Sequence, residues 1–240
     1  MHRNTQFLAS CIALMLFPCS VSLGQVIYNP ATQWDATNNP SANGPWTYGY
    51  KTTLTGSLTL FDTTASNTSG GVLLEWYASA VMSGLPNVAY NSSGTTDWTY
   101  LSATVVSPGE IDLHPGALNQ MPVLRFTAPQ AGTYTFAGNF NGDSTAGTTT
   151  NAYLQQNGTT FYSIAVTGFN TAFGFNETRS AVAGDTFDFV IDYGNDLDYS
   201  SDSTGLFLTV SAIPEPSTYG IFTGLVALGL SICRRRVRAD

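Results

Sequence analysis

Residues 186–193 read Thr-Phe-Asp-Phe-Val-Ile-Asp-Tyr, and the character of the side chains alternates along this stretch. One side carries Phe187, Phe189 and Ile191, and the other carries Asp188, Val190 and Asp192. A period of two is the repeat of a β-strand, in which neighbouring side chains point to opposite faces of the sheet. The stretch therefore predicts a strand that is buried on its aromatic face.

The same alternation marks three further stretches, at residues 53–61, 133–137 and 206–212. Weaker strand patterns occur at residues 72–77, 98–106, 122–127, 151–156, 161–166 and 172–178. Turn residues such as Asn-Gly and Pro-Gly separate these stretches. About ten short strands at this spacing predict one all-β domain over residues 25–212. We expect an antiparallel two-sheet sandwich with the topology of a jelly roll.

The predicted domain is strongly acidic. Between residues 25 and 212 there are 14 acidic residues and three basic ones, Lys51, Arg125 and Arg179, which gives a formal charge of −11. A nucleic-acid-binding protein needs a basic face to neutralise phosphates, so this composition excludes nucleic acid as a partner. An acidic surface attracts divalent cations instead.

The first 24 residues have the organisation of a signal peptide. Arg3 precedes an apolar run at residues 7–17, and small residues follow up to Gly24. The run is too short to span a bilayer, and cleavage after Gly24 by signal peptidase would start the mature chain at Gln25. Cleavage before Cys19, as in a lipoprotein, is the competing reading, but bulky Phe17 and Pro18 fit such a site poorly.

Residues 213–240 contain three successive features. The first is a motif of two prolines around a glutamate, which can continue neither a strand nor a helix. Residues 217–233 then follow without a charge, at the short end of what can span a membrane as a helix. An arginine cluster ends the chain and holds that end in the cytoplasm. The motif is Pro214, Glu215, Pro216 and Ser217, and the cluster is Arg234, Arg235, Arg236 and Arg238.

This tail resembles the PEP-CTERM sorting signal of Gram-negative bacteria, which joins Pro-Glu-Pro-Ser/Thr, a hydrophobic helix and an Arg-rich end. The resemblance implies that an exosortase, a membrane protease, processes the chain near the motif while the helix anchors it in the inner membrane. It also implies export to the cell surface or the extracellular matrix. The alternative is an ordinary single-pass membrane anchor.

Five short segments of the domain carry a second, looser resemblance. They are residues 46–49 (Trp-Thr-Tyr-Gly), 113–116 (Leu-His-Pro-Gly), 124–134, 183–186 (Ala-Gly-Asp-Thr) and 202–206 (Asp-Ser-Thr-Gly-Leu). These segments resemble a β-sandwich module of PEP-CTERM proteins from planctomycete-like bacteria. Such modules look like carbohydrate-binding jelly rolls, so the resemblance implies an architecture and no particular chemistry.

Candidate catalytic groups are few. Cys11, Cys19 and Cys233 all lie in the terminal segments, so the domain has no thiol nucleophile and no disulfide. His114 is the one histidine outside the signal peptide, and the chain has no Gly-x-Ser-x-Gly motif. A glycosidase would need two carboxyl groups across a cleft, and Glu75 in an apolar strand is the carboxyl that burial would perturb. We expect a protein without enzymatic activity.

The acidic residues are densest between residues 185 and 202. Calcium takes six to eight oxygen ligands at loose geometry, and a loop of aspartates with backbone carbonyls can supply them. Asp196, Asp198 and Asp202 are the candidate ligands of a structural calcium ion, although the glycine and the distal glutamate of an EF-hand are missing. The alternative is a solvated acidic turn without a cofactor.

Two groups of aromatic residues alternate on one face of a strand. Trp46, Tyr48 and Tyr50 form the first, and Trp98 and Tyr100 form the second; Trp46, Tyr48 and Trp98 are the candidate stacking residues. Exposed rings in a row can stack on sugars, whereas the same spacing is also that of a sandwich core.

The sequence therefore predicts an exported, non-enzymatic protein of the cell surface or matrix with a structural, adhesive or carbohydrate-binding role. Exopolysaccharide is the partner that this role implies. Two alternatives stay open: a secreted glycan hydrolase or lyase, and a membrane-tethered structural protein without a ligand.

Overall fold

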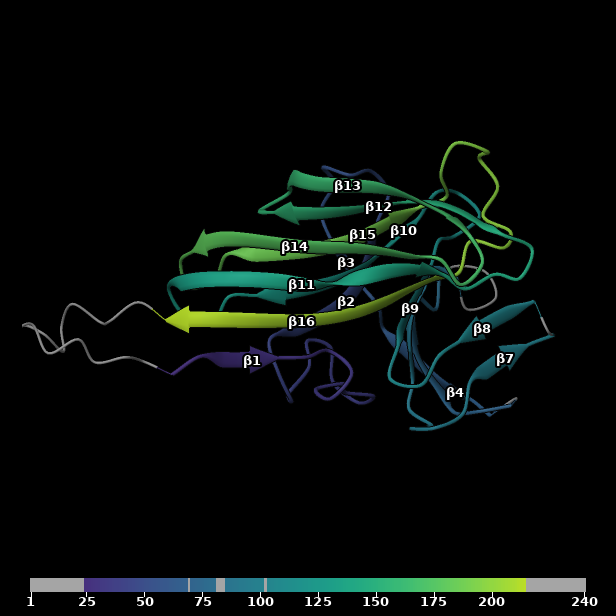
Figure 1. Cartoon of the computed structure of the whole chain (residues 1–240), viewed down its shortest axis with the longest axis horizontal. Helices are drawn as coiled ribbons and strands as arrows, with labels where there is room; N and C mark the ends of the chain where they lie inside the picture. Colours follow the sequence, from purple (N-terminus) through teal and green to yellow (C-terminus); the bar gives the residue numbers. More distant parts are fainter. Residues whose placement is uncertain (1–23, 69, 81–84, 102, 215–240) are drawn as a thin grey trace, which may run out of the picture. The chain divides into compact units, whose positions relative to one another are not determined.

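The computed structural model describes residues 24–68, 70–80, 85–101 and 103–214. These residues form strands connected by turns and loops, all of them drawn in Figure 1. In chain order the strands are β1 (Val26–Tyr28), β2 (Trp46–Lys51), β3 (Thr59–Leu60), β4 (Thr63–Asn67), β5 (Leu73–Tyr77), β6 (Asn87–Asn91), β7 (Trp98–Tyr100), β8 (Thr104–Val106), β9 (Ile111–His114), β10 (Met121–Thr127), β11 (Gly132–Gly142), β12 (Thr148–Gln156), β13 (Thr159–Gly168), β14 (Ala172–Ala181), β15 (Thr186–Asp192) and β16 (Thr204–Pro214). The all-β prediction is confirmed for the described residues.

The strands make two large antiparallel sheets. Sheet A has the order β14-β11-β16-β9-β6-β5-β4, with β1 also paired to β16. Sheet B has the order β13-β12-β15-β10-β2-β3. Strands β7 and β8 form a separate hairpin, and Figure 1 shows the long strands β14, β11 and β16 side by side.

The core lies between the two sheets and is rich in aromatic side chains. Phe136 of sheet A packs against Phe187 of sheet B with ring centroids 4.4 Å apart. Phe126 and Tyr134 meet edge to face at 5.6 Å beside them. Burial of these rings supplies most of the driving force for joining the sheets. The predicted two-sheet sandwich is therefore present in the described residues.

Strand β15 confirms one face of the predicted pattern and corrects the other. Phe187, Phe189 and Ile191 lie in the core as expected, but Asp188 and Val190 are also buried. Asp188 is paired with Lys51 and Arg125. Val190 is covered by the segment at residues 53–58, part of the stretch 53–61 that was expected to be a strand and of which only Thr59–Leu60 form one, β3. That segment forms a loop instead, and its Leu54 and Leu58 cover Met121, Val123 and Val190 on the outer face of sheet B.

The predicted strand at residues 98–106 is a hairpin. Leu101 at its turn has φ of 48°, in the left-handed region that ends a strand. The weaker predictions at residues 72–77, 122–127, 151–156, 161–166 and 172–178 correspond to β5, β10, β12, β13 and β14.

Four predictions fall wholly or mostly outside the described residues. They are the signal peptide at residues 1–24, the motif at 214–217 beyond Pro214, the apolar segment at 217–233, and the arginine cluster. Of the part that the structure describes, no helix is long and apolar enough to cross a bilayer.

Candidate functional site

A groove opens in sheet A at the edge of β16, where the pairing of this strand is interrupted. One edge of β16 pairs with β11 over its whole length, from residue 204 to 214. The other edge pairs with β9 at residues 204–206 and with β1 at residues 210–212. Residues 207–209 therefore lie between the ends of two partner strands. A cavity of about 190 Å³ occupies this place.

Phe207 is the aromatic residue of this groove, and its side chain is 36% exposed. Asn29, Gly109, Ala137 and Thr209 are among the other lining residues. The lining combines this ring and several apolar side chains with the Asn29 amide and the Thr209 hydroxyl, which can make stacking contacts and hydrogen bonds to one ligand.

The sheet surface next to Phe207 carries small, uncharged side chains. Asn139 of β11 is the register partner of Phe207, and Gly174 of β14 is the register partner of Asn139. Because Phe140 and Phe175 point into the core, their neighbours in each strand point outward. These outward residues are Thr133, Thr135, Ala137, Asn139 and Asn141 on β11, and Ala172, Gly174, Asn176, Thr178 and Ser180 on β14.

The aromatic residues proposed from the sequence do not form a sugar platform. Trp46 and Tyr48 are fully buried, because sheet B turns that face of β2 into the core. The Trp46 indole donates to the Gln33 side chain at 3.0 Å, as a core residue with a satisfied polar atom does. Trp98 is only 6% exposed. The alternation of Trp46 and Tyr48 is therefore that of a sandwich core, which was the alternative interpretation of the sequence.

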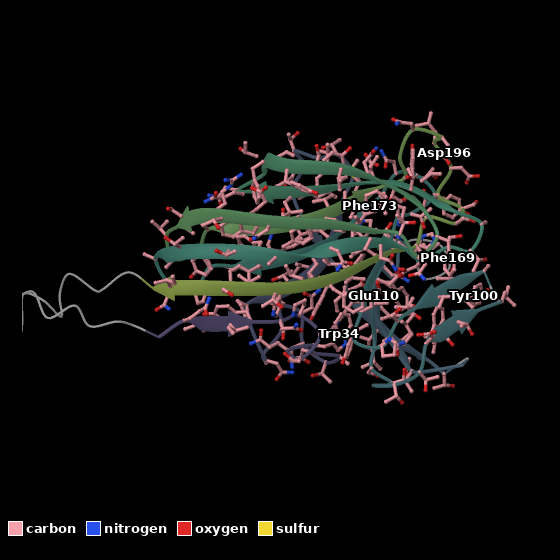
Figure 2. All side chains as sticks on the ribbon, viewed as in Figure 1. Trp34, Tyr100, Glu110, Phe169, Phe173 and Asp196 are labelled. Carbon is pink, nitrogen blue, oxygen red and sulfur yellow. The ribbon has the colours of Figure 1, made fainter. Side chains whose placement is uncertain are left out.

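The hairpin nevertheless exposes Tyr100, the second ring of the predicted Trp98–Tyr100 pair. Tyr100 stacks on Trp98 with ring centroids 6.1 Å apart and is 51% exposed. Figure 2 marks Tyr100 on this hairpin. No sequence signal separates it from Trp98, since both belong to the same short strand.

A group of buried carboxylates lies where β9, β11 and β16 meet. Glu110 and Asp143 are fully buried, and Asp112 is 4% exposed. Glu110 Oε2 accepts a hydrogen bond from the Ser107 amide at 2.8 Å, and Asp143 Oδ1 accepts one from the Asn141 side chain at 3.1 Å. Glu110 Oε1 and Asp143 Oδ2 have no hydrogen-bond partner. Figure 2 marks Glu110 beside the long strands.

Burial changes the acidity of this group. It raises the pKa of Glu110 to about 8, and the neighbouring charge of Asp112 adds to the rise. Burial likewise raises the pKa of Asp112 to about 7, with Glu75 contributing. The pKa of Asp143 lies well above its ordinary value, first through burial and then through the charges of Glu110 and Asp112. Neighbouring buried carboxylates resist ionising together.

The acidic loop after β15 is arranged differently from the predicted calcium site. Asp196 and Asp202 both accept a hydrogen bond from the Thr149 hydroxyl, at 2.7 and 3.1 Å. Asp198 instead accepts the amide of Ser200 in its own loop at 2.9 Å. Within the described ranges, no three His, Cys, Asp or Glu side chains gather closely enough to hold a metal ion.

A second buried acid, Asp188, lies on the outer face of sheet B. Its Oδ2 is 2.6 Å from Lys51 Nζ, and its Oδ1 is 2.6 Å from Arg125 Nε. Gln155 accepts a further hydrogen bond from Lys51 at 2.8 Å. A polar cavity of about 520 Å³ beside these residues is also lined by Asn157 and Thr186. The two basic residues that line this cavity, Lys51 and Arg125, already form ion pairs with Asp188.

The remaining catalytic candidates lie apart from any paired arrangement. His114 Nδ1 lies 2.9 Å from the Pro115 carbonyl oxygen, and burial lowers the pKa of the ring. Glu75 is half-buried in β5, where burial raises its pKa. The Glu110–Asp143 pair is sealed from solvent, so a polysaccharide chain cannot reach it in this conformation.

Comparison with known proteins adds solved structures of low similarity. The sequence matches no protein-family model. It also matches no curated protein. A structure of CBM4 aligns with 64% of this chain and 92% of its own, at 16% identity and a TM-score of 0.28. A family 35 carbohydrate-binding module from an environmental isolate aligns with 65% of this chain and 96% of its own, at 14% identity and a TM-score of 0.28.

A third similar structure is the C-terminal CBM6 of LamC, a marine laminarinase from Zobellia galactanivorans. It aligns with 42% of this chain and 79% of its own, at 9% identity and a TM-score of 0.27. At these TM-scores the fold assignment rests on the strands and sheets of this chain.

Proposed function

We propose that this chain is an exported PEP-CTERM protein whose jelly-roll-like domain binds neutral carbohydrate at the cell surface or in the matrix. The domain would act by binding and not by catalysis. The single observation that carries the binding role is the groove on sheet A, where the half-exposed Phe207 ring lies beside amide and hydroxyl groups.

The chemistry of this surface favours a sugar over other ligands. A pyranose ring offers apolar C–H faces for an aromatic ring and hydroxyl groups for amides such as Asn29 and Asn139. The uncharged surface of β11 and β14 continues from the groove and could accept further sugar units of a chain. Because the domain has a formal charge of −11, a neutral polysaccharide is favoured over a polyanionic one.

A non-enzymatic role is supported by the positions of the acids. Glycoside hydrolysis needs two carboxyl groups at a cleft that the sugar can enter. Glu110 and Asp143 are adjacent but fully buried, and no carboxylate is among the residues that line the groove beside Phe207.

The proposed export and processing of the chain rest on the C-terminal segment, residues 213–240. Pro214–Ser217 would be the processing motif of an exosortase, residues 217–233 the transient inner-membrane helix, and the arginine cluster its cytoplasmic end. Replacing Pro214, Glu215 and Pro216 by alanine should leave a full-length, membrane-held protein, and mass spectrometry of the mature C-terminus measures this. A wild-type chain that keeps Asp240 at its mature end would contradict the proposal.

Affinity electrophoresis of the full-length protein through gels that contain neutral or uronate-rich polysaccharides tests the binding role. We expect retardation by at least one neutral polysaccharide and a loss of about tenfold in affinity for Phe207→Ala, because a stacking contact of about 1.4 kcal/mol corresponds to a factor of ten. Phe169→Ala is the matched control, since Phe169 is 42% exposed and lies outside the groove. Binding that survives Phe207→Ala would rule out the groove, and no retardation by any polysaccharide would rule out the binding role.

A further inference from the structure

Three buried carboxylates lie near the start of β16 without a basic partner. They are Glu110, Asp112 and Asp143; Asp112 is the register partner of Gly205 in β16, and the Asp143 amide donates to the Ser203 carbonyl oxygen at 3.1 Å. The three basic residues among those that the structure describes are engaged elsewhere. Lys51 and Arg125 bind Asp188, and Arg179 binds Glu177 at 3.2 Å. No cationic side chain of the described residues therefore compensates the charge of the buried acids, although Asn141 and Ser203 donate hydrogen bonds to Asp143 and Asp112.

Two oxygen atoms of this group point to one place. If Gly205 carried a Cβ, that atom would lie 2.0 Å from Glu110 Oε1 and 2.8 Å from Asp143 Oδ2. The two oxygens are therefore within about 5 Å of each other, over a residue that has no side chain. Both are buried, and both are without a hydrogen-bond donor. A buried, unpartnered carboxylate oxygen is costly, and two of them on one spot indicate a missing positive partner.

We propose that Glu110 and Asp143 hold one divalent cation between these oxygens, and that calcium is the ion that fits. Calcium accepts carboxylate and carbonyl oxygens at 2.3–2.6 Å, so one ion can bridge two oxygens that are up to about 5 Å apart. Its loose geometry tolerates two acids completed by backbone oxygens and water, whereas magnesium demands a near-ideal octahedron. This site is separate from the acidic loop of Asp196 and Asp198, and it does not depend on carbohydrate binding.

The competing solution is a proton shared by the two carboxyl groups. A shared proton would also remove one of the two charges, and it needs no metal. The two solutions respond oppositely to added cations, which makes them separable by experiment. In the cation-bound form, binding stabilises the folded chain in proportion to the free ion concentration.

The test uses the full-length protein, purified in a mild detergent, stripped with EGTA and desalted. Calorimetric titration with CaCl₂ should give one ion per chain, and saturating Ca²⁺ should raise Tm by about 5 °C, since 1 kcal/mol corresponds to about 2–4 °C for a chain of this size. MgCl₂ should give a smaller rise. The wild-type titration needs no variant, so it decides the question even if a variant fails to fold.

Variants then place the ion. Glu110→Gln and Asp143→Asn should each abolish the Ca²⁺-induced rise in Tm, whereas Asp97→Asn, an exposed acid near the hairpin, should keep it. No binding heat and no rise in the wild type would overturn the proposal. So would a rise that is lost in Asp196→Asn and kept in Glu110→Gln. A Tm that ignores cations and falls as pH rises from 6 to 9, through titration of Glu75, Glu110, Asp112 and Asp143, would show the shared proton instead.

Discussion

Asp188 on sheet B and the Glu110–Asp143 pair beside sheet A are both buried acids, yet the chain treats them in opposite ways. Asp188 is 1% exposed and is bound by Lys51 and Arg125. Glu110 and Asp143 are fully buried with one unpartnered oxygen each. Two of the three cations of the domain thus serve a single aspartate. At Asp188, which we call the completed site, the domain supplies its own cations. At the Glu110–Asp143 pair, which we call the open site, the domain supplies no cation, and we propose that a calcium ion binds there.

The largest expected effect is at the completed site. Asp188→Ala should destabilise the protein by about 3–5 kcal/mol, because it leaves Lys51 buried without its counter-ion. Urea unfolding of the full-length protein measures the change, and Ca²⁺ should not restore it. A loss below about 1 kcal/mol would mean that the ion pair is not needed for folding and would weaken the contrast.

Another buried acid, Asp35, sharpens the comparison because hydrogen bonds alone stabilise its ionised form. Its carboxylate accepts bonds from the amides of Thr37, Asn38 and Ala42 at 2.8, 3.0 and 2.9 Å. Burial by itself would raise the pKa of Asp35, but these bonds and those from the Thr37 and Asn38 side chains hold it well below its ordinary value. Asp35→Ala should therefore cost about 2–3 kcal/mol at pH 7.

The pH dependence of that loss has a definite sign. The folded pKa of Asp35 lies below its ordinary value of 3.8, so its stabilisation is present above pH 4 and is lost as the pH falls further. Unfolding of wild type and Asp35→Ala should differ at pH 7 and converge towards pH 2. A difference that stays constant over this range would show that packing, and not the ionised carboxylate, is what the substitution removes.

The smallest effect is expected at the open site, and its sign should be reversed. In EGTA, Glu110→Gln should leave stability unchanged or raise it by about 1 kcal/mol, because it removes a buried carboxyl group that must either take up a proton on folding or carry an uncompensated charge. In saturating Ca²⁺ the same change should destabilise. Urea unfolding in both buffers checks this, and a loss of the same size in each would contradict an open site.

The local pattern of the sequence was enough to predict most strands, because alternation is a property of neighbouring residues. The stretch at residues 186–193 became β15, and residues 206–212 lie within β16. The loop at residues 53–58 was wrongly expected to be a strand, since its apolar Leu54 and Leu58 alternate correctly but cover sheet B from outside. Burial of Trp46 and Tyr48 was also a matter of which face the partner sheet covers.

The candidate sites depend on contacts between distant segments and could not be predicted. The groove exists because β1 and β9 pair with two separate parts of β16. Nothing in the sequence marks Glu110 and Asp112, which precede His114, as neighbours of Asp143, which lies 31 residues after Asp112. Their meeting over Gly205 is fixed by the order of β11, β16 and β9 in sheet A.

The most direct measurement is anomalous diffraction from crystals of the protein grown in CaCl₂. The account predicts an anomalous peak bonded to Glu110 Oε1 and Asp143 Oδ2 at distances of about 2.3–2.6 Å. Crystals in which the two oxygens approach each other at hydrogen-bond distance, with no peak between them, would contradict it.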